Sequence, residues 1–478
     1  MTQLRRSDAD YQTLFERLGK RGQAHVFKWW GELSPGDREI LLAEIASIPW
    51  SIIDPILPRI STRAENRATG ADLSPAPVWP LRPAPEKESL HREAVETGVR
   101  ALRRGKAAAL TVAGGLGTRL GVSGPKGMVA VTPIAGKTLF QLFAEMIRAA
   151  RNRYGSAIPW YILTSPSNDQ ATRDYFAAQR FFELPEGDVI FFQQGTLPAF
   201  DFEGRLLMAD RHRLALASDG HGGTLKALVD RGVLKDINRR GVECLSYFQI
   251  DNPMVRPFDP LFLGLHVMTK SEMSTKVSKK SDDLERVGNV CLREGKLCVI
   301  EYTDFPEEFA RARNADGSRR FDAGNLGIHL LNVGFIDRVV GRSFQLPIRR
   351  AEKIIETIDE AGRAIRPARP NGVKLETFVF DVLPLAASPL VLEANRAEEF
   401  SPVKNATGLD SLETSMRDQN LRACRWVAAA GLDVPLSPDG SPAVTAEISP
   451  MFALDEEELK SKAGAVPKLR PGTRVYLS

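Results

Sequence analysis

The 478-residue sequence has little cysteine and no long apolar run, and both absences narrow what the chain can be. Its four cysteines form neither a CxxC pair nor a regular framework, so we expect reduced thiols rather than disulfides. No run of about 18 apolar residues occurs, and the N-terminal MTQLRRSDAD lacks the apolar core of a secretory signal. We therefore expect a cytoplasmic protein with no membrane partner.

Charge of one sign is not in excess either. Lys and Arg number 64 against 60 Asp and Glu, which leaves a net charge of +4. Nucleic-acid-binding proteins usually concentrate basic side chains in a patch or stripe, and none stands out here, so we expect no nucleic-acid partner. The chain is too long for one ordinary domain, and two or three are expected.

The chain predicts three consecutive segments. Residues 1–97 form a helical N-terminal region with a Pro-rich linker at 66–87, residues 98–405 form a central α/β domain, and residues 406–478 form a linking helix and a small β-rich unit. The first helix is indicated by apolar residues at i, i+3, i+4 and i+7, namely Tyr11, Leu14, Phe15 and Leu18. A second helix should begin at Pro35 with Ser34 as its N-cap.

Short apolar runs alternate with helical patterns through the central domain. The expected strands are AAALTVAGG, IPWYILT, DVIFFQQG, CLSYFQIDN and FVFDVL. Residues 137–155 predict a helix, and residues 289–303 predict an antiparallel hairpin that turns at REGK. Such alternation is typical of an α/β fold with a mostly parallel sheet covered on both faces.

A glycine-rich loop directly follows the first central strand. Four glycines occur within eight positions: Gly114, Gly115, Gly117 and Gly121. Glycine lets backbone N–H groups approach a ligand at the C-terminal edge of the sheet, where ligands bind in open α/β folds. Arg119 and Lys126 lie in the same loop and can neutralise a polyphosphate. The competing interpretation is a glycine-rich turn without a ligand.

Two familiar phosphate-binding motifs do not fit this loop. A dinucleotide fingerprint should open straight into a helix, whereas this loop runs on through VSGPKG. Lys137 sits in a Gly-Lys-Thr triplet, but the first glycine of a Walker A motif would fall on Val131. We reject both motifs.

The segment AGGLGTRLGVSGPKGM resembles the signature of the nucleotide-sugar pyrophosphorylases of the UDP-sugar type, and among them the eukaryotic-type UDP-N-acetylglucosamine pyrophosphorylases. Further blocks follow in that family's order over residues 110–406: FFQQGTLPAFD, DGHGG, FQIDNPMV, CVIEYTD, FDAGNLGIH, NGVKLETFVFDVL and EEFSPVKNA. The resemblance implies a Rossmann-like, mixed and mostly parallel sheet with a helical N-terminal region and a small β-rich C-terminal unit.

The resemblance also implies a reaction and its substrates, UTP and a sugar 1-phosphate. A phosphate oxygen of the sugar attacks the α-phosphorus of UTP in line, and pyrophosphate leaves. This chemistry needs charge neutralisation and alignment. Lys126 and Arg119 are the expected catalytic cations, each with exposed surface charge as its alternative. Asp251 ends a strand and is the expected Mg²⁺ ligand, with an Asx-turn cap as the alternative.

The family's nucleotide-binding positions fall on two parts of this chain. They are Ala113, Gly114, Gly115, Gly117, Thr118, Gln194, Gly220 and His221. A Gln amide can pair with a uracil edge, and Gln193, which points the other way on a strand, is assigned a structural role. His221 departs from the family, which has Asn there; a His can still donate to a ribose or sugar hydroxyl, but it is bulkier and can titrate near neutral pH.

The family's sugar-phosphate positions lie further along the chain. They are Gly288, Glu301, Tyr302, Asn325, Lys374, Phe380 and Lys404. We expect Glu301 and Asn325 to bind hydroxyls or an amide, and Lys374 and Lys404 to bind phosphate. Gly288 and Phe380 are expected to border the sugar's 2-substituent, although core packing explains a Phe in FVFDVL equally well.

Three functions remain open at this point. The leading hypothesis is synthesis of UDP-N-acetylglucosamine from UTP and N-acetylglucosamine 1-phosphate. The second is a UTP–glucose-1-phosphate uridylyltransferase or a broad UDP-sugar pyrophosphorylase. The third, an inactive sugar-nucleotide-binding protein, is disfavoured because binding alone would not require Arg119, Lys126 and Asp251 together. The sequence leaves the oligomeric state open.

Overall fold

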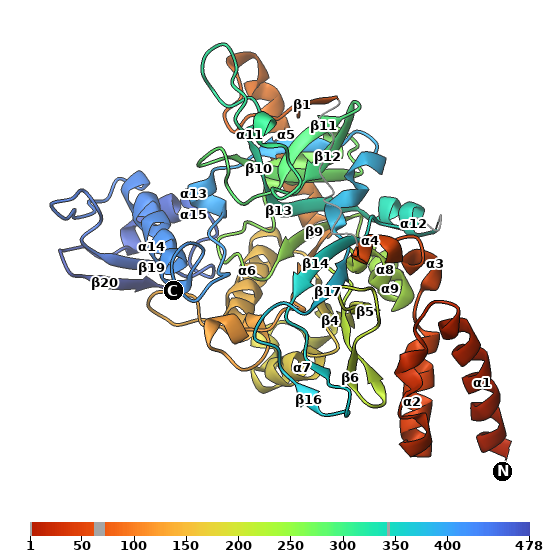
Figure 1. Cartoon of the computed structure of the whole chain (residues 1–478). Coiled ribbons are helices and arrows are strands. Elements are labelled where there is room, and N and C mark those ends of the chain that lie inside the picture. Colours follow the sequence, from red (N-terminus) through yellow and green to blue (C-terminus); the bar gives the residue numbers. More distant parts are fainter. Residues whose placement is uncertain (1, 62–71, 342–344) are drawn as a thin grey trace. The chain divides into compact units, whose positions relative to one another are not determined.

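The structure is a computed structural model and describes residues 2–61, 72–341 and 345–478 (Figure 1). The chain divides into two compact units, each assembled from separate stretches of sequence. Unit 1 is Met1–Asn66, Gln194–Gly223 and Phe344–Asp381, and unit 2 is Arg67–Gln193, Thr224–Ser343 and Val382–Ser478. These units differ from the three consecutive segments expected with boundaries at 97 and 405.

A shared apolar core explains the composition of unit 1. Leu18 and Leu41 of the N-terminal helices belong to the same buried cluster as Phe200 and Val373, which come from the two inserted stretches. Phe200 and Val373 also exchange backbone hydrogen bonds of 3.0 and 2.7 Å. The N-terminal helices therefore complete a core with later segments instead of forming a region of their own.

The α-helices of unit 1 named here come from its first stretch of sequence. They are α1 (Thr2–Gly19), α2 (Pro35–Ala46), α3 (Trp50–Ile53) and α4 (Leu57–Ser61), with 3-10 turns at Ala24–Phe27 and Trp30–Glu32. The expected start of α2 is confirmed: Pro35 is its first residue, and the Ser34 side chain accepts a hydrogen bond from the Asp37 N–H. This cap satisfies one of the unpaired N–H groups of the first turn.

The strands of unit 1 form short antiparallel pairs. They are β5 (Thr196–Pro198) with β8 (Leu216–Ser218), β6 (Met208–Asp210) with β7 (Arg213–Leu214), β14 (Arg349–Lys353) with β17 (Gly372–Glu376), and β15 (Thr357–Ile358) with β16 (Ala364–Ile365).

Unit 2 is built on a ten-stranded sheet. Its main path runs β1-β11-β13-β9-β2-β3-β4, and β10, β12 and β18 branch from it. The strands are β1 (Leu73–Pro75), β2 (Ala107–Val112), β3 (Trp160–Thr164), β4 (Val189–Gln193), β9 (Cys244–Gln249), β10 (Met273–Lys279), β11 (Asn289–Arg293), β12 (Lys296–Ile300), β13 (Ala323–Asn332) and β18 (Leu390–Glu393).

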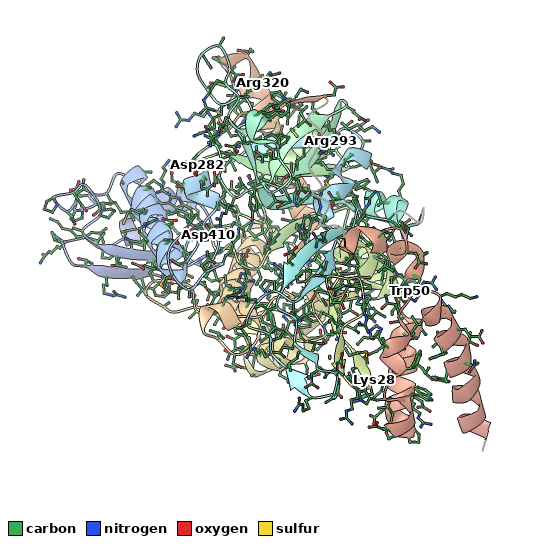
Figure 2. The ribbon with its side chains drawn as sticks, viewed as in Figure 1. Lys28, Trp50, Asp282, Arg293, Arg320 and Asp410 are labelled. Atoms are coloured by element: carbon green, nitrogen blue, oxygen red, sulfur yellow. The ribbon has the colours of Figure 1, made fainter. Side chains whose placement is uncertain are left out.

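The sheet is mixed, as the resemblance implied. Strands β9, β2, β3 and β4 are parallel neighbours; the residues of β9, β2 and β3 are almost all buried, and those of β4 are buried or partly buried. Strand β13 runs antiparallel to β9, and β11 pairs with β12 in the expected hairpin. Its turn residues Glu294 and Gly295 both have positive φ, and Arg293, labelled in Figure 2, pairs with Lys296 at its end.

Unit 2 also contains several α-helices, some of which pack against this sheet. They are α5 (Glu88–Arg103), α6 (Leu139–Tyr154), α7 (Asp169–Ala178), α8 (Gly223–Asp230), α9 (Val233–Arg239), α10 (Pro260–Met268), α11 (Glu307–Ala310), α12 (Val333–Gly341), α13 (Arg396–Glu399), α14 (Leu412–Ala429) and α15 (Glu456–Ser461). Phe140 and Phe143 of α6 share one core with Trp160 and Phe248 of the sheet. The helix predicted over residues 137–155 is confirmed, with Gly155 as its left-handed C-cap.

The Pro-rich linker is only partly described, because residues 62–71 lie outside the described part of the chain. Beyond it, β1 joins the edge of the sheet, and the Trp79 N–H donates to Val391 O at 2.7 Å. The described part of the linker is therefore an ordered crossing segment.

The C-terminal part of unit 2 has a small core of its own, seen in blue in Figure 1. The parallel pair β19 (Thr445–Ile448) and β20 (Arg474–Leu477) packs with α14 and α15. The segment is more helical than the β-rich unit that we expected. Its Glu447 carboxylate accepts the N–H groups of Ile134 and Ala135, at 2.6 and 2.9 Å.

One expected strand is wrong. The run FVFDVL is a 3-10 helix, Val379–Leu385, and the strand β17 ends earlier, at Glu376. The backbone leaves the sheet at Thr377, whose N–H donates to Asp219 O at 2.8 Å instead of to a strand. Pro384 lies within the 3-10 helix and lacks the N–H that a strand ladder would use.

No helix in the described ranges is long and apolar enough to cross a membrane.

Helices α5 and α10 approach unusually closely, and this contact yields a stability prediction. A Cβ added at Gly264 would lie 1.7 Å from Ala94 O, and one at Gly98 would lie 1.9 Å from Pro260 O. Gly264→Ala must push the helices apart, so we expect a loss of about 1–3 kcal/mol or more in the free energy of unfolding. The melting temperature of the variant checks this prediction. The control is Gly36→Ala in α2, where an added Cβ meets nothing within 4 Å and the melting temperature should not fall. Equal melting temperatures of the two variants would contradict the prediction.

Candidate active site

The glycine-rich loop after β2 closes on itself. The Gly117 N–H donates to Gly124 O at 2.8 Å, and the Lys126 N–H donates to Gly115 O at 3.0 Å. A Cβ at Gly117 would lie 3.1 Å from the Val122 side chain, so the close return of the loop leaves little room for a side chain there. The loop thus brings Lys126 back to the residues that follow β2, where the predicted nucleotide-binding residues Ala113, Gly114, Gly115, Gly117 and Thr118 lie.

Lys126 meets Asp251 at the end of the neighbouring strand. Its Nζ lies 3.1 Å from Asp251 Oδ2, and the two side chains are only 16% and 14% exposed. Because β2 and β9 are parallel neighbours, the loop after β2 and the residue after β9 emerge at the same sheet edge. The structure therefore brings together the predicted catalytic lysine and the predicted metal ligand.

The Asx-turn cap that was the alternative role for Asp251 is formed by the next residue, Asn252. Asn252 Oδ1 accepts the N–H groups of Met254 and Ser401, at 3.3 and 3.1 Å. Its amide nitrogen donates to Glu399 O at 2.7 Å, and Asp251 O accepts from the Val403 N–H at 2.8 Å. The Asp251 carboxylate is thus left to Lys126, while Asn252 fixes the segment after α13.

That segment carries the predicted phosphate ligand Lys404. The Lys404 side chain is 43% exposed, and its Nζ lies 3.8 Å from Asp410, which is labelled in Figure 2. Its main-chain N–H donates to Asp410 O at 2.7 Å. Lys404 therefore extends from a backbone that is fixed to the strand end bearing Asp251.

A buried ion triad supports the same segment. Lys276 Nζ is fully buried and lies 2.6 Å from both Asp259 Oδ2 and Glu399 Oε2. Burial opposes ionisation of Asp259, but Lys276 and Arg256 outweigh it and lower the Asp259 pKa to about 2. The two carboxylates compensate the Lys276 ammonium, which would be costly to bury alone. Through this contact Glu399 also anchors the segment that Asn252 holds.

Three predicted sugar-phosphate residues converge near the hairpin. A Cβ at Gly288 would lie 3.2 Å from Glu301 Oε1 and 3.7 Å from the Asn325 Cβ. The Asn325 N–H donates to Gly288 O at 2.8 Å, and its Oδ1 accepts the Gly327 N–H at 3.0 Å. Tyr302 is exposed beside a hollow of about 670 Å³.

The remaining predicted nucleotide- and sugar-phosphate-binding residues lie in unit 1. The Gly222 N–H donates to Thr377 O at 2.8 Å, and a Cβ at Gly220, which has φ of +82°, would lie 2.4 Å from the same oxygen. His221 stacks on Phe378 with ring centroids 5.0 Å apart and lies 5.6 Å from Phe380. The loop 219–223 is thus fixed against the residues that follow β17.

The other two residues in unit 1 have different settings. Lys374 is part of β17, opposite Ala351 of β14, and is partly exposed. Gln194 is buried, and a Cβ at the next residue, Gly195, would lie 2.5 Å from Asp219 Oδ2. Gln193, which ends β4 in unit 2, hydrogen-bonds Asp169, in keeping with its structural assignment.

Although a His can titrate near neutral pH, the surroundings of His221 shift its pKa well below that range. Burial, followed by the nearby Arg349 guanidinium, lowers the His221 pKa to about 4. The Val379 N–H donates to His221 Nδ1 at 3.3 Å, so the neutral ring carries its proton on Nε2. Hydroxyl donation by Nε2 remains compatible with this tautomer, but a charge at pH 7 does not.

Arg119 is exposed in a 3-10 turn, Thr118–Leu120, and no hydrogen bond or ion pair joins it to any described residue. Lys137, by contrast, is buried and bonds Glu145 and Ser449, which supports the rejection of a Walker A motif.

Sequence reasoning missed the supporting roles of Asn252 and Lys276. Asn252 carried a signal, because it directly follows Asp251 at a strand end, whereas Lys276 lies within an ordinary strand.

A glycine loop at a strand end, with a lysine and a carboxylate beside it, defines a nucleotide-binding α/β protein. The family described as UTP–glucose-1-phosphate uridylyltransferase matches residues 78–421. The human UDP-N-acetylhexosamine pyrophosphorylase-like protein 1 is 36% identical over 95% of this chain and 94% of its own. The Saccharomyces cerevisiae UDP-N-acetylglucosamine pyrophosphorylase is 34% identical over 93% and 96%.

Solved structures agree with these relatives. The UDP-N-acetylglucosamine pyrophosphorylase from Trypanosoma brucei, solved with an inhibitor, matches over 98% of both chains with a TM-score of 0.80 and 25% identity. A UDP-glucose phosphorylase from the same organism, at 16% identity and a TM-score of 0.61, shows the fold alone. The chain belongs to the UTP–glucose-1-phosphate uridylyltransferase family.

The lowered pKa of His221 predicts a pH-dependent stability. The unfolded chain takes up a proton on this ring near pH 6.5, whereas the folded chain does so only near pH 4. Its contribution to stability is therefore present above pH 6.5 and is lost as the pH falls toward 4. The control is His221→Asn, which keeps an acceptor and does not titrate. As the pH falls from 6.5 toward 4, the melting temperature of the unchanged chain should fall relative to that of this variant. A constant difference between the two melting temperatures would contradict the assigned environment.

Proposed function

We propose that the chain joins UTP to N-acetylglucosamine 1-phosphate, forming UDP-N-acetylglucosamine and pyrophosphate. The carrying observation is the 3.1 Å pair of Lys126 and Asp251 beside the glycine loop. Family membership supports a nucleotidyltransferase that uses UTP and a sugar 1-phosphate. The names of the human and yeast relatives support the N-acetylated sugar.

The proposed roles follow from chemistry that needs positioning and charge. A phosphate oxygen of the sugar forms a bond to the α-phosphorus of UTP, and the bond from that phosphorus to the bridging oxygen of pyrophosphate breaks. Negative charge grows on the leaving pyrophosphate, and cations held beforehand lower the barrier. Lys126 would bind the α-phosphate, and the exposed Arg119 would bind the leaving group.

The two substrates would use the residue sets expected from the family. The base and ribose would bind Gln194, Gly220 and His221 together with the loop residues Ala113, Gly114, Gly115, Gly117 and Thr118. The sugar phosphate would bind Gly288, Glu301, Tyr302, Asn325, Lys374, Phe380 and Lys404. The convergence of Gly288, Glu301 and Asn325 supports the second set, because it gathers a carboxylate and an amide beside a residue without a side chain.

Asp251 fits a magnesium ion through the chemistry of its donor. Within the described residues no three His, Cys, Asp or Glu side chains form a cluster that could hold a metal on their own. Mg²⁺ commonly binds one or two carboxylates and takes its other ligands from phosphates and water. Asp251 would therefore hold the ion together with the triphosphate, and the bound ion would neutralise phosphate charge.

A glucose 1-phosphate substrate is the second candidate, because the family's description names it. The space at Gly288 bears on the choice. A Cβ added at Gly288 would lie 2.8 Å from a Val299 side-chain carbon and 3.2 Å from Glu301 Oε1, so a side chain there would collide with its neighbours. A pyrophosphate-release assay should decide, pairing UTP, ATP, CTP and GTP with the 1-phosphates of glucose, N-acetylglucosamine and N-acetylgalactosamine. We expect UTP and N-acetylglucosamine 1-phosphate to release pyrophosphate faster than any other pair. A preference for glucose 1-phosphate would favour the second candidate. No pyrophosphate release with any pair would refute the proposed activity.

Loss of the Lys126 ammonium should impair the chemical step. Lys126→Ala should lower kcat by about a hundredfold or more, because one preorganised charge is removed from the transition state. The control is Lys235→Ala, at an exposed lysine of α9, which should keep normal turnover. Near-normal turnover of folded Lys126→Ala would remove the catalytic role.

A further inference from the structure

Asn168 has an unusual position for a helix-capping residue. It occupies the N-cap position of α7, yet its side chain makes no hydrogen bond to that helix. It is 1% exposed and turns toward the glycine loop instead. Its Oδ1 accepts the Ser165 N–H at 2.8 Å, which fixes the orientation of the amide group.

The Asn168 amide nitrogen holds two carbonyls of the loop. Nδ2 donates to Ala113 O at 2.8 Å and to Gly115 O at 3.2 Å. The carbonyl between them, Gly114 O, accepts from Ser165 Oγ at 2.8 Å. Three consecutive carbonyls after β2 are thus held by two buried side chains from the connection between β3 and α7.

Holding a carbonyl also aims an N–H group. In a trans peptide the C=O of one residue and the N–H of the next point in opposite directions. Because Ala113 O and Gly115 O both face Asn168, the N–H groups of Gly114 and Leu116 point away from it. Neither N–H donates to any atom of the described protein, and Gly115 and Leu116 are exposed.

We propose that Asn168 is a positioning residue that sets the loop N–H groups for UTP. It touches no substrate; it acts by fixing the peptide planes of Ala113–Gly114 and Gly115–Leu116. This inference rests on the proposed function in one respect only, namely that the loop is the UTP site. Ser165 assists by fixing the peptide between them.

Asn168→Asp is the sharpest test, because it keeps the size of the side chain and the acceptor for Ser165. The ionised carboxylate has no donor, and it repels the carbonyls of Ala113 and Gly115. We expect the Kd for UTP, measured by calorimetry, and the KM for UTP to rise about tenfold or more, since small misplacements of binding groups are costly. The KM for the sugar 1-phosphate at saturating UTP should change much less.

Asn168→Ser adds a graded readout, because one donor remains. Its UTP affinity should lie between that of the unchanged chain and that of Asn168→Asp. The matched control is Asn420→Ala in α14, whose amide bonds Val444 O and the Ala446 N–H in the C-terminal core. It should lower the melting temperature without changing the Kd for UTP.

The outcomes separate this proposal from the proposed function. Normal UTP binding in folded Asn168→Asp overturns the positioning role, even when the chain is an active uridylyltransferase. Weakened UTP binding in Asn168→Asp supports it, even when no sugar 1-phosphate is turned over. If the Asp variant fails to fold, Asn168→Ser decides: UTP affinity equal to that of the unchanged chain overturns the role.

Discussion

The pairing of Lys126 with Asp251 depends on two parallel strands ending at one sheet edge. Strand β2 delivers the glycine loop, and β9 delivers Asp251, with the strands in register from Ala107 and Cys244 onward. Without a bound ligand the ammonium and carboxylate satisfy each other at 3.1 Å. In a largely buried pair of this kind each charge is compensated by the other, so neither is buried alone.

The surrounding structure of unit 2 serves to hold that edge in place. Asn252 fixes the segment 399–404 to the strand end, and the buried Lys276 fixes Glu399. On the other side, Asn168 and Ser165 hold the carbonyls of the loop. These contacts are made by polar side chains that are themselves buried, so each has a defined geometry and a cost if it is broken.

Much of the central fold could be predicted because its signals are local. The runs that form β2, β3, β4 and β9 are short and mostly apolar, with glycine or a polar residue within two positions of each strand end, and the positive φ angles of Glu294 and Gly295 match the turn expected at REGK. The run FVFDVL failed because a short apolar stretch suits a strand or a helical turn equally. The N-terminal helices were predicted, but their packing with Phe200 and Val373 was not, because it depends on contacts far apart in sequence.

The same distinction holds for the candidate site. Gly114 and Asp251 stood out because they follow apolar runs, and Lys126 because it lies in the glycine-rich loop; the structure brings Lys126 and Asp251 into contact. The pKa of His221 could not be predicted, because burial and Arg349 set it. Asn168 carried no signal, since an Asn before a helix is an ordinary cap. The individual roles of the site residues, the magnesium ion and the cellular compartment stay predictions.

The most direct test of the central claim is an experimental structure with a non-hydrolysable UTP analogue and Mg²⁺. We predict the triphosphate over the glycine loop, with a phosphate oxygen within hydrogen-bonding distance of Lys126 Nζ and the metal beside Asp251. A triphosphate bound elsewhere, with the Lys126–Asp251 pair unchanged and no ligand near it, would contradict the account.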